Sequence, residues 1–180
     1  ADGKCWLDRN LGATQVATAY NDSASYGWIF QWGRSADGHQ IPTSSTTSIK
    51  SSSDTPGHAF FITDSNPPYD WDWRDPHNDN LWQGVDGINN PCPTGFRLPT
   101  MQEWTTLFNS AGITNFTTAF NSSLKLTTAG YRDHLSGIYE LLGYGEGYYW
   151  SSTSTYAFYF NYNSANMIQQ FRSTGFSVRC

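Results

Sequence analysis

Apolar and polar residues alternate along the C-terminal part of the chain with the period of two that is typical of β-strands. Strand candidates lie at residues 125–131, 148–152, 157–163, 167–172 and 176–180. Two short polar segments, 164–166 and 173–175, separate the last three candidates and predict turns. We therefore expect the chain to finish in an antiparallel β-meander.

A helical pattern follows residue 100. Four apolar residues recur at i, i+3, i+4 and i+7: Trp104, Leu107, Phe108 and Ala111. Thr100 and Glu103 have the spacing of a capping box, in which each side chain satisfies one free backbone N–H at the start of a helix. Gly112 supplies the stop signal. This segment predicts a helix with one buried apolar face.

The N-terminal part of the chain carries weaker signals. Residues 4–11 alternate imperfectly and predict an opening strand. Residues 24–32 predict a short helix, because Asp22 or Ser23 can cap its start and Gly33 can end it.

Two long polar segments lie between the predicted helices. Residues 35–56 are rich in Ser, Thr and Gly, and residues 66–90 are rich in Asp, Asn, Pro and Trp, so both predict loops. Loops of this length in a compact domain are usually functional or carefully packed. The pattern as a whole predicts an α+β fold with two helices packed on small antiparallel sheets, long loops and the terminal meander.

Length and charge narrow the class of protein. The 180 residues suit one domain over positions 1–180, since no Pro/Ser stretch divides them. The net charge is −5 and the chain has few basic residues, so it offers no basic stripe for a phosphate backbone, and we expect no nucleic-acid partner. No apolar run approaches the roughly 20 residues that span a bilayer, so we expect no membrane insertion.

Composition favours binding over catalysis. Aromatic residues make up 17% of the chain and charged residues 14%, and Arg172 and Arg179 are the only charges in residues 147–180. Acid–base and nucleophilic catalysis use His, Asp, Glu, Lys or Cys side chains. Antibody paratopes instead use Tyr as a rigid anchor and Ser, Asn and Gly as adaptable hydrogen-bonding partners.

Four segments together resemble a known family. They read WLDRNLGAT at 6–14, YGWIFQWGRSADGH at 26–39, NPCPTGFRLPTMQEW at 90–104, and YWSSTS with GFSVRC at 149–154 and 175–180. In this order they resemble the C-type lectin-like fold, in the branch shared with formylglycine-generating enzymes. Within that branch the chain is similar to variable proteins of diversity-generating retroelements, whose C-terminal segment an error-prone reverse transcriptase rewrites. The similarity covers most of the chain.

This resemblance implies a ligand-binding display protein on a cell surface or a virion surface, such as that of a phage or an archaeal virus. Residues 148–180 would be its variable segment, and its partner would be a protein or a glycan on a cell or particle surface. The expected ligand-binding residues form one solvent-facing patch: Thr153, Thr155, Tyr156, Tyr159, Asn161, Asn163, Asn166, Ile168, Phe171, Ser173 and Thr174.

The genetic code offers a check on this interpretation. Mutating the adenines of an Asn codon reaches Ser, Thr, Ile, Tyr, Asp and Phe, but not Trp, Met, Gln, Glu or Lys. All the expected ligand-binding residues belong to the accessible set, whereas Gln169 and Gln170 do not. Either Gln169 and Gln170 are positions that mutagenesis does not change, or the template encodes Lys at these positions and mutation of its adenines gave Gln.

Strand alternation divides the same segment into two faces. One face would carry Phe158, Phe160 and Tyr162 into the core. The other face would present Tyr159, Asn161 and Asn163. In the next strand, Asn166 and Ile168 would lie opposite Met167.

The cysteines argue against an enzyme. Oxidation of a substrate cysteine by formylglycine-generating enzymes relies on a pair of active-site cysteines, and Cys180 has no second cysteine near it in sequence. We expect Cys92 and Cys180 to form a disulfide if the protein matures in an oxidising compartment, because the segment before the capped helix and the terminal strand both belong to the central core, and we expect Cys5 to stay free. A Cys5–Cys180 bridge is the alternative, because the first and last strands pair in this fold.

The segment after residue 66 fits two interpretations, an ordered loop or a calcium site. Its oxygen-bearing side chains are Asp70, Asp72, Asp75, Asn78, Asp79 and Asn80. They would form either an ordered loop packed by Trp71, Trp73 and Trp82 or a site for a structural calcium ion, although the pattern of an EF-hand is absent. We expect no other cofactor. The four histidines, His39, His58, His77 and His134, lack metal-binding spacing and are expected on the surface or in loops.

A second function class also fits the sequence. A lectin-like surface module of fixed specificity would bind a glycan by stacking its aromatic rings on sugar. A near-identical template repeat beside a reverse-transcriptase gene would favour the diversified binding protein.

Overall fold

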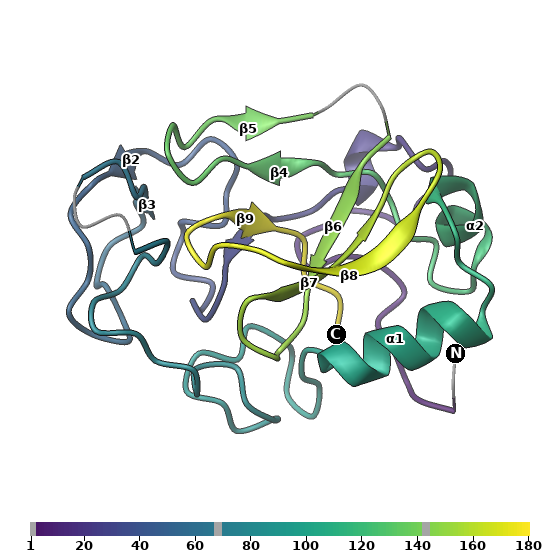
Figure 1. The fold of residues 1–180 in the computed structure, drawn as a ribbon, viewed down its shortest axis with the longest axis horizontal. Coiled ribbons are helices and arrows are strands. Elements are labelled where there is room, and N and C mark those ends of the chain that lie inside the picture. Colours follow the sequence, from purple (N-terminus) through teal and green to yellow (C-terminus); the bar gives the residue numbers. More distant parts are fainter. Residues whose placement is uncertain (1–2, 67–69, 142–144) are drawn as a thin grey trace.

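The computed structural model describes residues 3–66, 70–141 and 145–180 (Figure 1). Its helices are the 3₁₀ turn η1 (Ser23–Ser25), α1 (Met101–Ser110) and α2 (Phe116–Asn121). Its strands are β1 (Phe30–Gln31), β2 (Thr46–Thr47), β3 (Phe61–Ile62), β4 (Tyr131–Arg132), β5 (Tyr139–Glu140), β6 (Gly147–Trp150), β7 (Tyr156–Phe160), β8 (Ala165–Gln169) and β9 (Gly175–Phe176). The α+β class is confirmed.

Three small sheets organise the chain. The strands β6, β7 and β8 form an antiparallel meander, and a second antiparallel sheet has the order β1-β9-β4-β5. The third sheet pairs β2 with β3 in parallel, which departs from the expectation of antiparallel sheets alone. None of the helices in the described parts of the chain combines the length and apolarity needed to cross a membrane.

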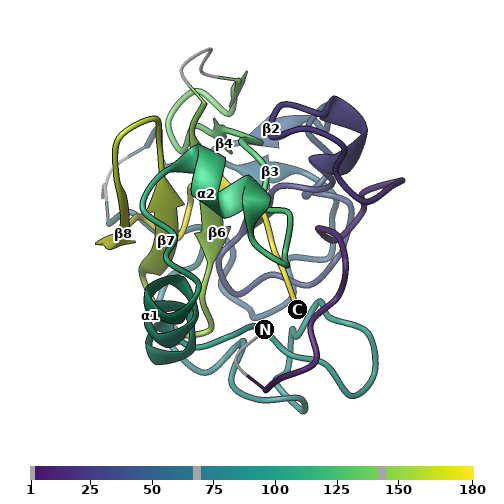
Figure 2. The ribbon, with the colours of Figure 1, turned by 90° about the vertical axis from the view of Figure 1, so that its right-hand side faces the viewer.

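Helix α1 forms as the sequence predicts. The Thr100 hydroxyl accepts a hydrogen bond from the Glu103 N–H at 3.2 Å, and the Thr100 N–H donates to the Glu103 carboxylate at 2.8 Å. Arg97 donates two hydrogen bonds of 2.7 Å to that carboxylate and lowers the pKa of Glu103 to about 2. Trp104 and Leu107 are buried against β7 and β8, beside which α1 lies (Figure 2).

The predicted helix over residues 24–32 is mostly wrong. Asp22 does cap its start, but only the turn Ser23–Ser25 forms. Gly27 ends it at φ +73°, where a Cβ would lie 2.2 Å from the Leu11 carbonyl oxygen. The following residues become β1 and pair with β9, so the second α-helix is the unpredicted α2.

Two predicted strands, residues 4–11 and 125–131, do not form as regular paired strands. Residues 4–11 form no strand and make two backbone hydrogen bonds to the terminal segment, from Leu7 to Cys180 and from Leu11 to Val178. Residues 125–131 are largely irregular, and β4 begins only at Tyr131. The last strand, β9, lies between β1 and β4, so it does not belong to the meander of β6, β7 and β8.

The terminal segment is fixed by covalent and polar contacts. Cys92 and Cys180 form the expected disulfide, and Cys5 is exposed and free. The buried Arg179 guanidinium donates to Asn10 Oδ1 at 2.9 Å and to the Leu124 carbonyl at 2.8 Å. The end of the chain therefore belongs to the scaffold.

His39 lies in a turn, as expected of a loop residue, but its side chain is buried. Its Nε2 accepts from the Gln31 N–H at 3.0 Å and its Nδ1 lies 2.6 Å from Asp37 Oδ1, an arrangement that suits a neutral ring with its proton on Nδ1. Burial lowers the pKa of His39 to about 4.

This burial predicts a loss of stability in mild acid. Between pH 6.5 and 4 the unfolded chain binds a proton at His39 that the folded chain excludes, so the free energy of unfolding falls as the pH drops through this window. From 1.36 kcal/mol per pH unit, we expect a loss of about 2 kcal/mol by pH 4.5. Urea unfolding at pH 7 and 4.5 should show a smaller loss in His39→Gln than in the wild type, and equal losses would contradict the assignment.

Candidate functional site

The β7–β8 hairpin presents two different faces. Its pairing is continuous from Tyr156↔Gln169 to Phe160↔Ala165, so alternate side chains point to opposite sides. Phe158 and Phe160 are fully buried against α1, which confirms their predicted place in the core. Tyr159, Asn166 and Ile168 share the opposite face, as expected, although Ile168 is half-buried and packs against the core.

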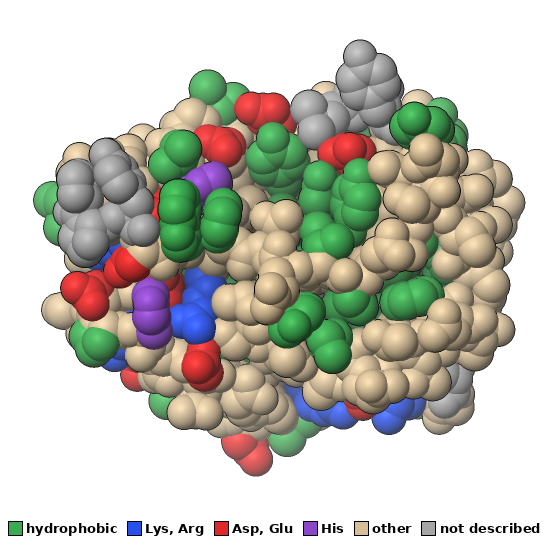
Figure 3. All heavy atoms as spheres, in the orientation of Figure 1, with side chains coloured by type: hydrophobic (Ala, Val, Ile, Leu, Met, Phe, Trp, Pro, Cys, Tyr) green, Lys and Arg blue, Asp and Glu red, His purple; other side chains and the backbone are tan. Residues whose placement is uncertain are grey.

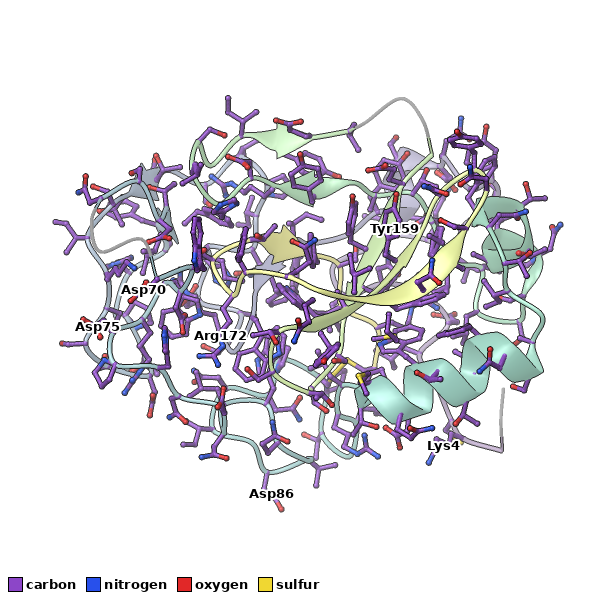
Figure 4. All side chains as sticks on the ribbon, in the orientation of Figure 1. Lys4, Asp70, Asp75, Asp86, Tyr159 and Arg172 are labelled. Carbon is purple, nitrogen blue, oxygen red and sulfur yellow. A yellow bond between two sulfur atoms is a disulfide. The ribbon has the colours of Figure 1, made fainter. Side chains whose placement is uncertain are left out.

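Tyr159 is held rigidly on the outward face of β7 (Figure 4). Its hydroxyl donates to Glu146 Oε1 at 3.0 Å and accepts from Asn161 Nδ2 at 2.8 Å. The Tyr148 ring lies 4.8 Å away, and the Tyr148 hydroxyl donates to Glu146 Oε2 at 2.8 Å. Burial and the bond to Glu146 raise the pKa of Tyr159, so its hydroxyl remains protonated at neutral pH.

The turn after β7 changes the predicted pattern. Asn161 Oδ1 accepts from the Asn163 N–H, the Ser164 N–H and the Ser164 hydroxyl at 2.9–3.0 Å, so Asn161 builds the turn. Because β7 ends at Phe160, alternation stops there. Tyr162, expected in the core, is 63% exposed.

Asn161 and Asn166 therefore form a matched pair for mutation. Asn161→Ala should lower the free energy of unfolding by about 1–2 kcal/mol, because it removes the acceptor of the turn. Asn166→Ala should change it by no more than about 0.5 kcal/mol, because Asn166 is exposed. Denaturant melts of both variants measure the difference, and an equal cost at the two positions would contradict the division between turn and display residues.

Several predicted site residues are not on the outward face. Ser173 and Thr174 are buried, because the chain turns inward after Phe171 to enter β9. Thr153 uses its hydroxyl to accept the Met101 N–H at the start of α1. Tyr156 lies an odd number of residues from Tyr159 in one regular strand, so it is on the other face. The expectation of one patch of eleven exposed residues is wrong.

An exposed aromatic stack borders the hairpin instead. The Phe171 ring lies 4.5 Å from Trp71 at an interplanar angle of 21°, and His134 lies 4.8 Å from Phe171. Trp71 and Phe171 are 43% and 38% exposed. Trp73 and Trp82 are buried as expected for residues that pack the long loop, whereas Trp71 points outward. Figure 3 shows hydrophobic side chains gathered on one face of the molecule.

Charged side chains from the loop that carries Trp71 form ion pairs near this stack. Arg172 donates to Asp72 at 2.8 Å and pairs with Asp79, and Lys50 pairs with Asp70 (Figure 4 shows Arg172 and Asp70). These carboxylates thus face basic side chains. Within the described ranges, no three His, Cys, Asp or Glu side chains are grouped so as to hold a metal ion. Residues 67–69 of the predicted loop lie outside the described residues.

Two hollows flank Phe171. One has a volume of about 250 Å³ and is bounded by β4, β6 and the segment from Gln170 to Phe176. The other, of about 180 Å³, lies between the Asp70–Asp72 loop and the residues Thr155 and Arg172. Thr155 has φ +65°, which turns the chain between β6 and β7 beside this second hollow.

Sequence reasoning missed the residues that complete these hollows: Trp71, Tyr131, Asp133, His134, Tyr148, Gln170 and Phe176. They come from segments of the chain that are as far apart in sequence as Trp71 and Phe176. The only signal in the sequence was the high content of aromatic residues, 17% of the chain. That content does not show which aromatic residues lie together in the fold.

Comparisons of this chain with protein-family models, with curated proteins and with solved structures give no match.

Proposed function

We propose that this chain is a ligand-binding display protein of the C-type lectin-like fold, whose outward C-terminal residues are diversified by retroelement mutagenesis to recognise varied macromolecules. Its place would be a cell surface or a virion surface, and its ligand a protein or glycan on another surface. The Cys92–Cys180 disulfide supports an oxidising location.

The separation of scaffold and display residues in one hairpin carries this proposal. Phe158 and Phe160 hold the inner face of the hairpin in the core, while Tyr159, Asn163 and Asn166 on the outer side contribute little to it. Both flanks of the segment are anchored, by the buried Trp150 before it and by the terminal residues after it. The exposed side chains of Asn163, Asn166 and Phe171 can therefore be exchanged without repacking the core, whereas Ile168 packs against it.

The outward residues also suit recognition. Tyr and Trp are enriched among residues that dominate binding energy at interfaces. Tyr159 is oriented by hydrogen bonds, and Phe171 is stacked on Trp71, so little side-chain freedom is lost when a ligand binds. We expect Phe171→Ala to weaken binding of a selected ligand by about 2 kcal/mol.

The test is a displayed library randomised at Tyr159, Asn163, Asn166 and Phe171 and selected against purified proteins and glycans. We expect folded binders with diverged sequences for several targets. A control library randomised at Phe158 and Phe160 should yield few folded members. If every selected binder retains the present outward residues, or if both libraries lose folding equally, the proposed diversification is wrong.

A lectin of fixed specificity is the second candidate, and the exposed Trp71–Phe171 stack favours it because flat aromatic faces pack against sugar rings. Retention of the present residues in binders selected on glycans alone would support this alternative. Binders to unrelated proteins would support the display protein.

A further inference from the structure

We propose that the hollow between β4, β6 and Phe171 receives a lysine or arginine side chain of a protein ligand. This inference rests on the proposed function, because it assigns a partner chemistry to one part of the same binding face. Its support comes from the shape of the hollow, the charges around it and one hydroxyl in its wall.

Aromatic rings form the walls of the hollow. Tyr148 stacks on Phe176 at 4.8 Å and 13°, and Tyr131 meets Tyr148 edge-on at 5.5 Å. Phe171 and His134 line another part of the wall. A cavity of about 150 Å³ holds a benzene molecule, so a volume of about 250 Å³ admits one long side chain. Aromatic faces attract alkylammonium and guanidinium groups, most strongly where water is partly excluded.

Carboxylates surround these rings. Asp133 lines the hollow, Glu140 lies 3.4 Å from the Tyr131 hydroxyl, and Glu146 lies 2.8 Å from the Tyr148 hydroxyl. In the described parts of the chain, no lysine or arginine forms an ion pair with these three carboxylates. Figure 3 shows acidic side chains beside the hydrophobic ones on this face.

Two arginines that are next in sequence to residues of the wall are engaged elsewhere. The Arg132 guanidinium is buried, lies over the Phe61 ring and donates to Ser44 at 2.6 Å. Arg172 pairs with Asp72 and Asp79. His134 also lines the hollow, with Nδ1 3.6 Å from Asp133 Oδ2, and burial lowers its pKa, which favours the neutral ring. The carboxylates around the hollow therefore complement a cationic group.

One polar group of the wall lacks a partner. Thr174 lines the hollow, is only 4% exposed, and its Oγ1 has no hydrogen-bond partner among the described residues. Buried hydroxyls in native proteins are nearly always hydrogen-bonded. Threonine has alternative staggered χ1 rotamers, so rotation can turn Oγ1 towards an N–H donor in the hollow. An ammonium or guanidinium group supplies such donors and has no acceptor of its own to satisfy.

The experiment is an NMR titration of the protein with N-acetyl-lysine N-methylamide and, as a matched neutral compound, N-acetyl-norleucine N-methylamide. We expect saturable shifts at Thr174 and Tyr148 with the lysine compound, at millimolar concentrations, and no such shifts with norleucine. Methyl glycosides form a third arm. Equal shifts with norleucine, or saturable shifts with glycosides alone, would overturn the proposal.

Two isosteric variants and one control test the residues. Glu146→Gln keeps hydrogen-bonding atoms beside both tyrosines and removes the charge, and Thr174→Val removes the hydroxyl. Each should weaken lysine binding at least threefold with the thermal midpoint nearly unchanged. Asp86→Asn removes one charge at a site far from the hollow (Figure 4) and should leave binding unchanged. Equal effects of Glu146→Gln and Asp86→Asn would contradict a local cation site.

The two proposals fail separately. If the library of outward variants yields binders while the lysine compound causes no saturable shifts, the cation site is wrong and the display function stands. If the lysine compound binds while no library member selects a ligand, the hollow is a cation site and the display function is wrong.

Discussion

Replacing Trp104 with alanine is expected to lower the free energy of unfolding by about 3–5 kcal/mol, the usual range when a buried large aromatic side chain is removed. Trp104 is fully buried in α1, and its ring lies 5.2 Å from those of Trp6 and Phe158. Its indole N–H donates to the Trp150 carbonyl at 3.2 Å. The mutation therefore leaves a cavity and an unpaired carbonyl beneath the hairpin that carries the outward residues.

The matched control is Gln102→Ala on the exposed side of the same helix, which should change stability by less than about 0.5 kcal/mol. Denaturant unfolding of both variants at neutral pH gives the comparison. If Trp104→Ala proves as mild as Gln102→Ala, α1 does not support the hairpin as described.

The second large effect concerns the Cys92–Cys180 disulfide. Its cysteines are separated by 88 positions, and loss of a cross-link over a loop of that length costs roughly 4–5 kcal/mol through the entropy of the unfolded chain. We expect Cys92→Ala combined with Cys180→Ala to lower the free energy of unfolding by about that amount. Urea unfolding without reductant measures it.

Cys5→Ala serves as the control, because Cys5 is exposed and unbridged. Its stability should match that of the wild type within about 0.5 kcal/mol. Peptide mapping that found a Cys5–Cys180 bridge, or a double variant as stable as the wild type, would contradict the arrangement of the terminal segment.

The features that sequence predicted well are those fixed by neighbouring residues. The capping box of Thr100 and Glu103 and the apolar face of α1 depend on spacings within one helix. The burial of Phe158 and Phe160 follows from alternation in a single strand. Local chemistry is sufficient for each of these.

The failures involve partners that are distant in sequence. Gly27 ends the first helix because its backbone packs against Leu11, and no local pattern reveals that contact. Ser173 and Thr174 have the composition of a surface turn, yet they are buried because the next residues pair with β1 and β4. Trp71 meets Phe171 across a hundred positions, so the site itself could not be predicted from sequence.

Diversification of the outward residues is most directly tested by sequencing the gene segment for residues 148–180 from many cells or particles of one population. We expect substitutions to gather at outward positions such as Asn163, Asn166 and Phe171, at bases that correspond to adenines of the template repeat, and to spare Phe158, Phe160 and residues 176–180. A segment as uniform as the rest of the gene would contradict the account.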